Sequence, residues 1–142
     1  MKKNNPMKRK IKSPTWYRKK LVERAKTEAK KRDGYRCQYC GKTKDQGWVI
    51  HGSHILSEGA YPLLSVEPYN IIALCAICHQ GGFSKYGIGV SKVPSWHGDP
   101  AIFMPWFEDK WPGRIKELRA MKEKKRTHVI NWKLRWEETK EG

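Results

Sequence analysis

Two pairs of cysteines, each with the spacing Cys-x-x-Cys, constrain the fold of this chain more than any other feature. The first pair is Cys37 with Cys40, the second is Cys75 with Cys78, and the 142 residues contain no other cysteine. Each pair can hold two sulfurs on one side of a tight turn, and two pairs complete a tetrahedron around one zinc ion. The spacing therefore predicts a four-thiolate zinc site, which is coordinatively closed and stabilises the fold.

A redox-active pair and an iron–sulfur cluster are the alternative uses of these cysteines. A redox site needs only one pair and usually lies in a thioredoxin-like fold, of which the sequence gives no sign. Zinc also suits the composition, because 38% of the residues are hydrophobic and 31% are charged. In small sites zinc contributes on the order of 10 kcal/mol of folding free energy, enough to hold together a small core.

Positive charge is concentrated in the two ends of the chain. The formal net charge is +16, to which residues 1–36 contribute +12, residues 37–110 contribute −1 and residues 111–142 contribute +5. Such an excess attracts phosphate through counterion release, so we expect the basic ends to bind nucleic acid. The alternative is that helices rich in lysine and arginine only keep the protein in solution.

Neither a secretory signal nor a membrane span is predicted. The basic N-terminus is not followed by an apolar run, and no stretch approaches the roughly 18 apolar residues of a membrane helix. We therefore expect a cytoplasmic protein, in a bacterium or a phage-infected host, with no membrane partner. Cysteines stay reduced there and bind metal rather than form disulfides. The sequence does not indicate an oligomeric state.

The segment before the first cysteine pair is predicted as a helix. Ser13 and Pro14 are typical of an N-cap and a first helical position, and Gly34 is typical of a helix stop. We expect a flexible basic tail over residues 1–12 and a basic helix over residues 13–34.

The segment after the second pair is predicted to end in another basic helix. This helix falls within residues 113–142 and runs from near Gly113 towards Trp136. Residues 93–112 mix prolines with aromatic residues, so they are predicted as an irregular packed segment. We interpret its large rings as core filling, with base stacking as the alternative: Trp96, Trp106, Phe107 and Trp111.

Two histidines and an asparagine accompany the cysteine pairs. His54 ends a predicted strand, Asn70 lies five residues before the third cysteine, and His79 directly follows the fourth. The order Cys-x-x-Cys, His-Ile, Asn-Ile, Leu-Cys-x-x-Cys-His resembles that of zinc-containing HNH endonucleases of the ββα-metal, or His-Me finger, class, over about residues 33–82. Three longer segments are similar to phage recombination endonucleases of the NinG type: RDGYRCQYCG, GSHILSEGAYPLLSVEPYNI and FMPWFEDKWPGRIKEL.

The resemblance implies a fold, an activity and two kinds of metal ion. The fold class is α+β, with a small zinc-stapled ββα-metal (HNH) core over residues 35–112 and basic N- and C-terminal helical extensions. The activity is hydrolysis of phosphodiester bonds in DNA, either duplex or the branched intermediates of phage recombination. The ions are a structural Zn²⁺ and a catalytic Mg²⁺, Mn²⁺ or other divalent cation.

Three side chains receive roles in this interpretation. Hydrolysis of a phosphodiester needs an activated water and relief of the charge on the phosphate. His54 is the candidate base, because a neutral imidazole is available near pH 7. In the family, the residue that matches Asn70 helps to position the loop and the base. His79 is the candidate ligand of the catalytic metal, with contact to the zinc thiolates as the alternative.

One position departs from the family. Many HNH enzymes carry a metal-ligating aspartate directly before the base, and this chain has Ser53 there. NinG-like sequences carry an acid three positions before the histidine, where this chain has His51. A ligand at His51 would favour Mn²⁺, Ni²⁺ or Zn²⁺ over Mg²⁺, which prefers oxygen. The missing carboxylate could instead come from another part of the chain: Glu58, Asp45 or Asp99.

Further polar residues and two other classes of protein complete the sequence-based predictions. His97 is interpreted as a loop residue, with phosphate contact as the alternative, and His128 has no assigned role. A non-catalytic, zinc-stabilised nucleic-acid-binding module is the alternative function, and a structural assembly protein is a third. Four basic side chains are candidates for phosphate contact, with solvated surface charge as the alternative: Arg36, Lys42, Lys85 and Lys92.

Overall fold

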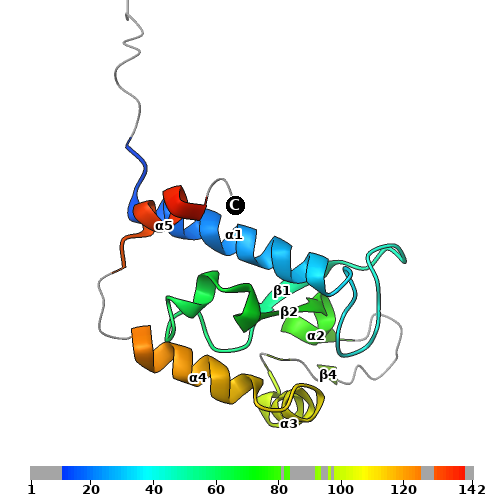
Figure 1. Cartoon of the computed structure of the whole chain (residues 1–142). Coiled ribbons are helices and arrows are strands. Elements are labelled where there is room, and N and C mark those ends of the chain that lie inside the picture. The colour runs from blue at the N-terminus through cyan, green and yellow to red at the C-terminus, as the bar shows by residue number, and fades with distance from the viewer. Residues whose placement is uncertain are drawn as a thin grey trace, which may run out of the picture.

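The structure, a computed structural model, combines helices with two small antiparallel sheets of two strands each and is therefore of the α+β class (Figure 1). It describes residues 11–80, 82–83, 92–93, 96, 98–125 and 130–139. The elements in chain order are α1 (Pro14–Arg32), β1 (Ile50–His54), the 3₁₀ turns η1 (Leu64–Val66) and η2 (Pro68–Asn70), β2 (Ile71–Cys75), α2 (Ala76–Gln80), β3 (Gly82–Phe83), β4 (Lys92–Val93), α3 (Pro100–Lys110), α4 (Arg114–Lys125) and α5 (Trp132–Thr139).

Helix α1 forms where its end signals predict it. The Ser13 hydroxyl accepts a hydrogen bond from the Trp16 amide, Pro14 is the first helical residue, and Gly34 adopts a φ of 67° just beyond the helix. One narrow stripe of the helix is buried, and the predicted helix over residues 13–34 is confirmed. The buried residues are Leu21, Val22, Ala25 and Ala29.

The β1–β2 hairpin is the centre of the fold. The strands pair antiparallel, with Ile50 opposite Cys75 at one end and His54 opposite Ile71 at the other. All five residues of β2 are buried, as expected for a short apolar run between packed layers. In Figure 1 the hairpin lies between α1 on one side and α4 on the other.

The apolar core has two parts, one on each side of the hairpin. On the α1 side, Ile71 packs against Ala25 and Ala29. The larger part joins the hairpin to α3 and α4, and its fully buried side chains include Ile72, Leu74, Phe103, Phe107 and Leu118. No helix in the described part of the chain is long and apolar enough to cross a membrane.

The prediction of an irregular segment over residues 93–112 was wrong, because α3 occupies most of it. Pro100 stands at the first helical position, where a missing amide hydrogen costs nothing. Phe103 and Phe107 lie four residues apart on the buried face, and this packing holds the helix despite Pro105. The predicted core-filling rings are buried or partly buried against this core: Trp96, Trp106, Phe107 and Trp111.

The prediction of one helix over residues 113–142 was also wrong. The chain forms α4 and α5, and Ile130 and Asn131 before α5 are not helical. Asn131 ends any continuous helix because its side-chain oxygen caps α5, accepting from the Leu134 amide at 3.0 Å. Residues 1–10 of the predicted flexible tail lie outside the described residues.

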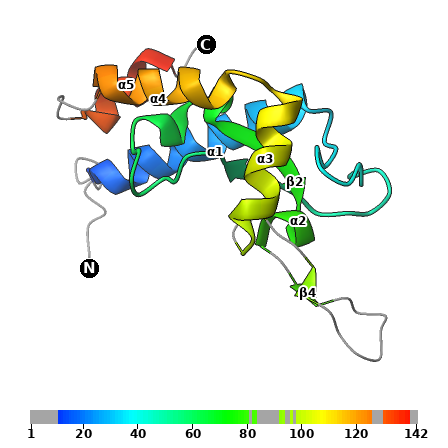
Figure 2. The ribbon, with the colours of Figure 1, turned by 90° about the horizontal axis from the view of Figure 1, so that it is seen from below.

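Helix α5 returns to lie against α1 (Figures 1 and 2). The Arg24 guanidinium donates to the Thr139 carbonyl at 2.6 Å and lies over the Trp136 ring at 4.4 Å. Trp136 also meets Trp16 edge to face at 5.9 Å. The C-terminal helix therefore covers part of the basic surface of α1.

Candidate metal centre and histidine site

Cys37, Cys40, Cys75 and Cys78 come together as a cluster, and we call them the cysteine cluster. Their four sulfurs all lie within 4.8 Å of one another, and three of the four cysteines are buried. The sulfurs of Cys40 and Cys75 are 3.7 Å apart. Zinc–sulfur bonds of about 2.3 Å in a tetrahedron place two sulfurs about 3.8 Å apart, so the donor set fits a zinc ion.

Backbone geometry holds each half of the cysteine cluster. The Cys40 amide points at the Cys37 sulfur at 3.5 Å, and the Cys78 amide points at the Cys75 sulfur at 3.4 Å. Gly41, with φ of 81°, completes the first turn in a conformation that glycine adopts readily. The Gln38 amide donates to the Ala73 carbonyl at 2.9 Å and joins the first turn to β2.

The thiols of the cysteine cluster influence one another strongly. The pKa of Cys37 is lowered because the Cys75 and Cys78 thiols donate hydrogen bonds to its sulfur, and the pKa values of those two donors are raised. One thiolate is thus stabilised by its neighbours. A bound cation replaces the shared protons, which is why metal affinity at such a site depends on pH.

His54 lies at the end of β1 with one ring nitrogen held by the backbone. Nε2 lies 2.8 Å from the Ser65 carbonyl oxygen, so Nε2 carries the hydrogen and donates it. The lone pair is then on Nδ1, which is 4.0 Å from a Glu58 carboxylate oxygen. Burial is the main reason that the pKa of His54 is lowered. The imidazole is therefore neutral near pH 7.

Asn70 is fully buried and closes the loop between β1 and β2. Its side-chain oxygen accepts from the Leu56 amide at 2.9 Å, and its amide donates to the Leu56 and Leu64 carbonyls at 3.0 and 3.1 Å. Leu64 directly precedes Ser65, whose carbonyl accepts from His54. Asn70 therefore holds in place the segment that orients the His54 ring.

His51 and His79 form a second histidine site, which we call the histidine pair. Their Nδ1 atoms are 2.9 Å apart and their rings stand at 87°. Two nitrogens at this distance can share a proton, or can both ligate one ion at bonds of about 2.1 Å. The pKa of His51 is lowered by burial and by the charges of Lys26 and Lys30.

In the described part of the chain, no carboxylate joins the histidine pair in a cluster close enough to share an ion. Ser53 is fully buried, and its hydroxyl has no hydrogen-bond partner. Within the described ranges, the cysteine cluster is the only group of three or more His, Cys, Asp or Glu donors close enough to share an ion. Of the three predicted acids, Glu58 lies beside His54, Asp45 is exposed, and Asp99 is the N-cap residue of α3.

Lys26 on α1 links the two histidine sites, and sequence reasoning missed it. Its side-chain stem lies against Gly52, where a Cβ atom would approach the Lys26 Cγ to 2.7 Å. Its charge contributes to lowering the pKa of both His51 and His54. The one signal in the sequence is the glycine between the two histidines, since such a residue permits a close approach.

The predicted phosphate contacts are only partly described. Arg36 donates to the Gly41 carbonyl at 3.4 Å, and the Lys42 ammonium lies 4.5 Å from the centre of the Trp48 ring. Both side chains belong to the first cysteine turn. Lys85, the Lys92 side chain, His97 and His128 lie outside the described residues.

Comparisons of this chain with protein-family models, with curated proteins and with solved structures gave no match.

Proposed function

We propose that this protein is a metal-dependent endonuclease of the HNH type that hydrolyses phosphodiester bonds in DNA. The observation that carries the proposal is the setting of His54. A buried, neutral imidazole donates Nε2–H to a backbone carbonyl and leaves Nδ1 as a free base. This is the state a general base needs in order to take a proton from water.

The order of elements supports the same proposal. The candidate base ends β1, a loop closed by Asn70 follows, and β2 leads into α2, which carries His79. The cysteine cluster joins the start and the end of this ββα unit, and we propose that it holds a structural zinc. Since its four thiolates would fill a tetrahedral shell, hydrolysis needs a different ion.

The histidine pair supplies two nitrogen donors for that second ion. A bound divalent cation would neutralise charge on the phosphate and on the leaving oxygen. Two imidazoles favour Mn²⁺, Ni²⁺ or Zn²⁺ over Mg²⁺, because Mg²⁺ prefers oxygen ligands. Lys26, next to both His51 and His54, adds a positive charge where the phosphate would lie.

Basic groups on α1 suit a DNA substrate. Eight of the 19 residues of the helix are Lys or Arg, and its last turn contains Lys30, Lys31 and Arg32. Such a surface binds phosphates without reading the sequence of bases. Branched DNA of phage recombination is the substrate we propose, and the cytoplasm of the infected cell is the proposed location.

A plasmid-nicking assay with added Mg²⁺, Mn²⁺, Ni²⁺ or Zn²⁺ tests the proposal. The expected result is metal-dependent cutting by the natural chain and a loss of at least about 100-fold in the His54→Ala and His54→Gln variants. His54→Gln is the sharper variant, because its side-chain amide can still donate to the Ser65 carbonyl but cannot accept a proton. Zinc content and DNA affinity should stay unchanged in both variants.

A chain that binds DNA and never cuts it with any of the four ions would refute the nuclease proposal. That result would support the non-catalytic, zinc-stabilised nucleic-acid-binding module instead.

A further inference from the structure

A cleft at the C-terminal end of α1 lies outside the histidine site and has no assigned role. Its volume is about 550 Å³, within the range of about 300–1,000 Å³ that is usual for small-ligand sites. Its walls come from the end of α1, the η2 turn and the corner between α3 and α4. The lining residues are Arg32, Asp33, Gln38, Tyr69, Lys110, Trp111, Pro112 and Arg114.

The cleft holds more positive than negative charge. Arg32 and Arg114 both donate to the Ile71 carbonyl, so the two guanidinium groups lie close together. Lys110 adds a third cation. Among the described residues that line the cleft, Asp33 is the one acid, and its carboxylate already accepts from Arg32 and from the Ala73 amide.

The excess charge in the cleft favours an anion. Arg114 is only 7% exposed, and its pKa is lowered by burial and then by the charge of Arg32. An anion between the two guanidinium groups would compensate both effects. The Nε and Nη2 groups of both arginines already donate to Asp33 or to backbone carbonyls, and Arg32 Nη1 donates to the Pro68 carbonyl. The hydrogens left for a phosphate are therefore those on Nη1, chiefly of Arg114.

Aromatic rings stand beside these cations. The Arg114 guanidinium lies 4.7 Å from the centre of the Tyr69 ring and 5.2 Å from that of Trp111. Tyr69 is 38% exposed, and its hydroxyl donates to Glu117 at 2.6 Å, which holds the outer end of the side chain in place. A fixed and partly exposed ring next to a phosphate site can stack on a nucleobase.

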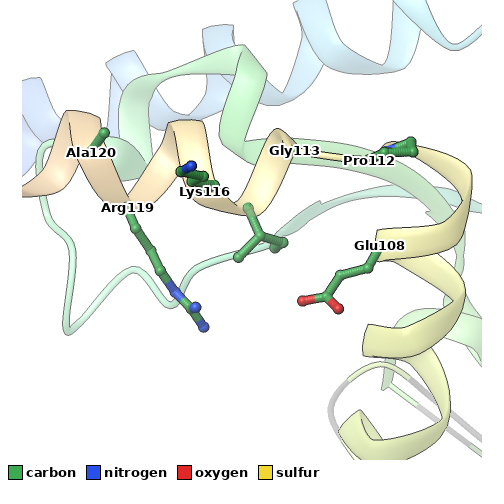
Figure 3. A pocket seen from close by; sticks show the side chains of 7 residues that line it. Glu108, Pro112, Gly113, Lys116, Arg119 and Ala120 are labelled. Carbon is green, nitrogen blue, oxygen red and sulfur yellow. The ribbon is translucent and has the colours of Figure 1, made fainter.

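A neighbouring hollow of similar size serves as a comparison. It measures about 560 Å³ and lies over the outer side of the α3–α4 corner, where Glu108 and Arg119 extend towards the same opening (Figure 3). Its described lining residues include Lys116 but no aromatic ring. Both hollows therefore contain cations, and the cleft differs from its neighbour in combining cations with aromatic rings.

We propose that this cleft binds an unpaired nucleotide of a single-stranded nucleic acid, with the phosphate at Arg32, Lys110 and Arg114 and the base stacked on Tyr69. Bases in a duplex are stacked on one another, so a single strand offers its ring faces more readily. The proposal rests on the nucleic-acid binding that we proposed above, and it does not depend on cleavage.

Fluorescence anisotropy with a labelled oligothymidylate and with a duplex of equal length tests the proposal. All variants are made in the full chain carrying His54→Ala, without added divalent ions, so that cleavage cannot interfere. Tyr69→Ala should weaken single-strand binding about tenfold or more and leave duplex binding nearly unchanged. Tyr69→Phe keeps the ring and should bind the single strand like the parent.

Two charge reversals provide the matched comparison. Lys110→Glu places an acid in the cleft, and Lys116→Glu makes the same change on the exposed side of the neighbouring hollow. Lys110→Glu should weaken single-strand binding several-fold more than Lys116→Glu. Equal losses for the two variants, or an unchanged affinity for Tyr69→Ala, would overturn the proposal. Where Tyr69→Ala fails to fold, judged by circular dichroism and zinc content, the two charge reversals decide.

A free nucleotide offers the same phosphate and ring, so thymidine monophosphate is included as a competitor. It should displace the oligonucleotide only at concentrations far above the oligonucleotide's dissociation constant. If the mononucleotide binds as tightly as the strand, the cleft is a nucleotide site and the strand proposal is refuted. DNA binding without cutting in the natural chain would refute only the nuclease proposal and leave this one standing.

Discussion

The cysteine cluster and the His54 ring lie at opposite ends of the β1–β2 hairpin and are built differently. At one end Cys75 lies opposite Ile50, and at the other end His54 lies opposite Ile71. The pairs are four residues apart, which is about 13 Å along a strand. The cysteine cluster brings together four like donors in a closed group, whereas the histidines are split between a pair and a separately held ring.

This difference in construction indicates that the cysteine cluster stabilises the fold, whereas the proposed hydrolysis would use the histidines. A closed set of four sulfurs offers no free position to a substrate, so its contribution is to hold the chain together. His54 keeps a lone pair on Nδ1, which the proposed hydrolysis would use. Changes at the cysteine cluster and changes around His54 should therefore have different effects, and four predictions test this separation.

The largest effect is expected at the cysteine cluster. Cys78→Ser removes one thiolate and leaves the others without a full shell, so most of the zinc contribution, on the order of 10 kcal/mol, should be lost. We expect an unfolded chain, as measured by circular dichroism and bound zinc. A folded Cys78→Ser protein without metal would show that the cysteine cluster is not needed to stabilise the fold.

A smaller loss of stability is expected at Asn70. Asn70→Ala leaves the Leu56 amide and the Leu56 and Leu64 carbonyls without their partner, at a cost of about 2–4 kcal/mol. Nicking should fall as well, because the loop that orients His54 loosens. Ser57→Ala, in the same loop, removes one long and exposed hydrogen bond and should change neither urea stability nor nicking.

Gly52→Ala tests the contact between α1 and the histidine strand. The added Cβ would meet the Lys26 stem at 2.7 Å, so α1 must shift at a cost of about 1–3 kcal/mol. Gly59→Ala is the control, since nothing lies within 4 Å of a Cβ there. Thermal unfolding should separate the two variants, and similar melting temperatures would argue against the close approach of α1.

The smallest effect is expected on the pH dependence of nicking, which depends on the pKa of His54. Burial lowers the pKa of His54 from its ordinary value of 6.5, so the neutral ring persists below that pH. Because the folded state prefers the neutral ring, its stabilisation is present above pH 6.5 and is lost as the pH falls through the folded-state pKa. Glu58→Gln removes a charge that raises this pKa, so the acid limb of the pH–rate profile should move to lower pH. A shift to higher pH would contradict the arrangement.

Local signals made part of this structure predictable. Ser13, Pro14 and Gly34 lie at the ends of α1, so this helix can be predicted from neighbouring residues. Each cysteine turn can likewise be predicted from the Cys-x-x-Cys spacing alone. Helix α3 could not be predicted in the same way, because its prolines argued against a helix and its stability comes from burying Phe103 and Phe107.

The arrangement of His51, His54 and His79 depends on contacts between distant parts of the chain, which the sequence alone does not show. The pairing of His51 with His79 requires both the strand register and the position of α2. The role of Lys26 requires knowing which face of α1 meets Gly52. Glu58 could be named as one of three acids, but only the fold distinguishes it, since Arg18 on α1 holds its carboxylate at 2.8 Å beside His54.

The burial of Ser53 limits which residues can stand directly before His54. Its side chain lies in the interior with an unpartnered hydroxyl. A mutation to aspartate would bury an unpaired charge, which is costly in stability. Alanine, by contrast, would remove an unsatisfied polar atom at almost no cost. Small apolar residues should therefore be tolerated at this position more easily than an acid.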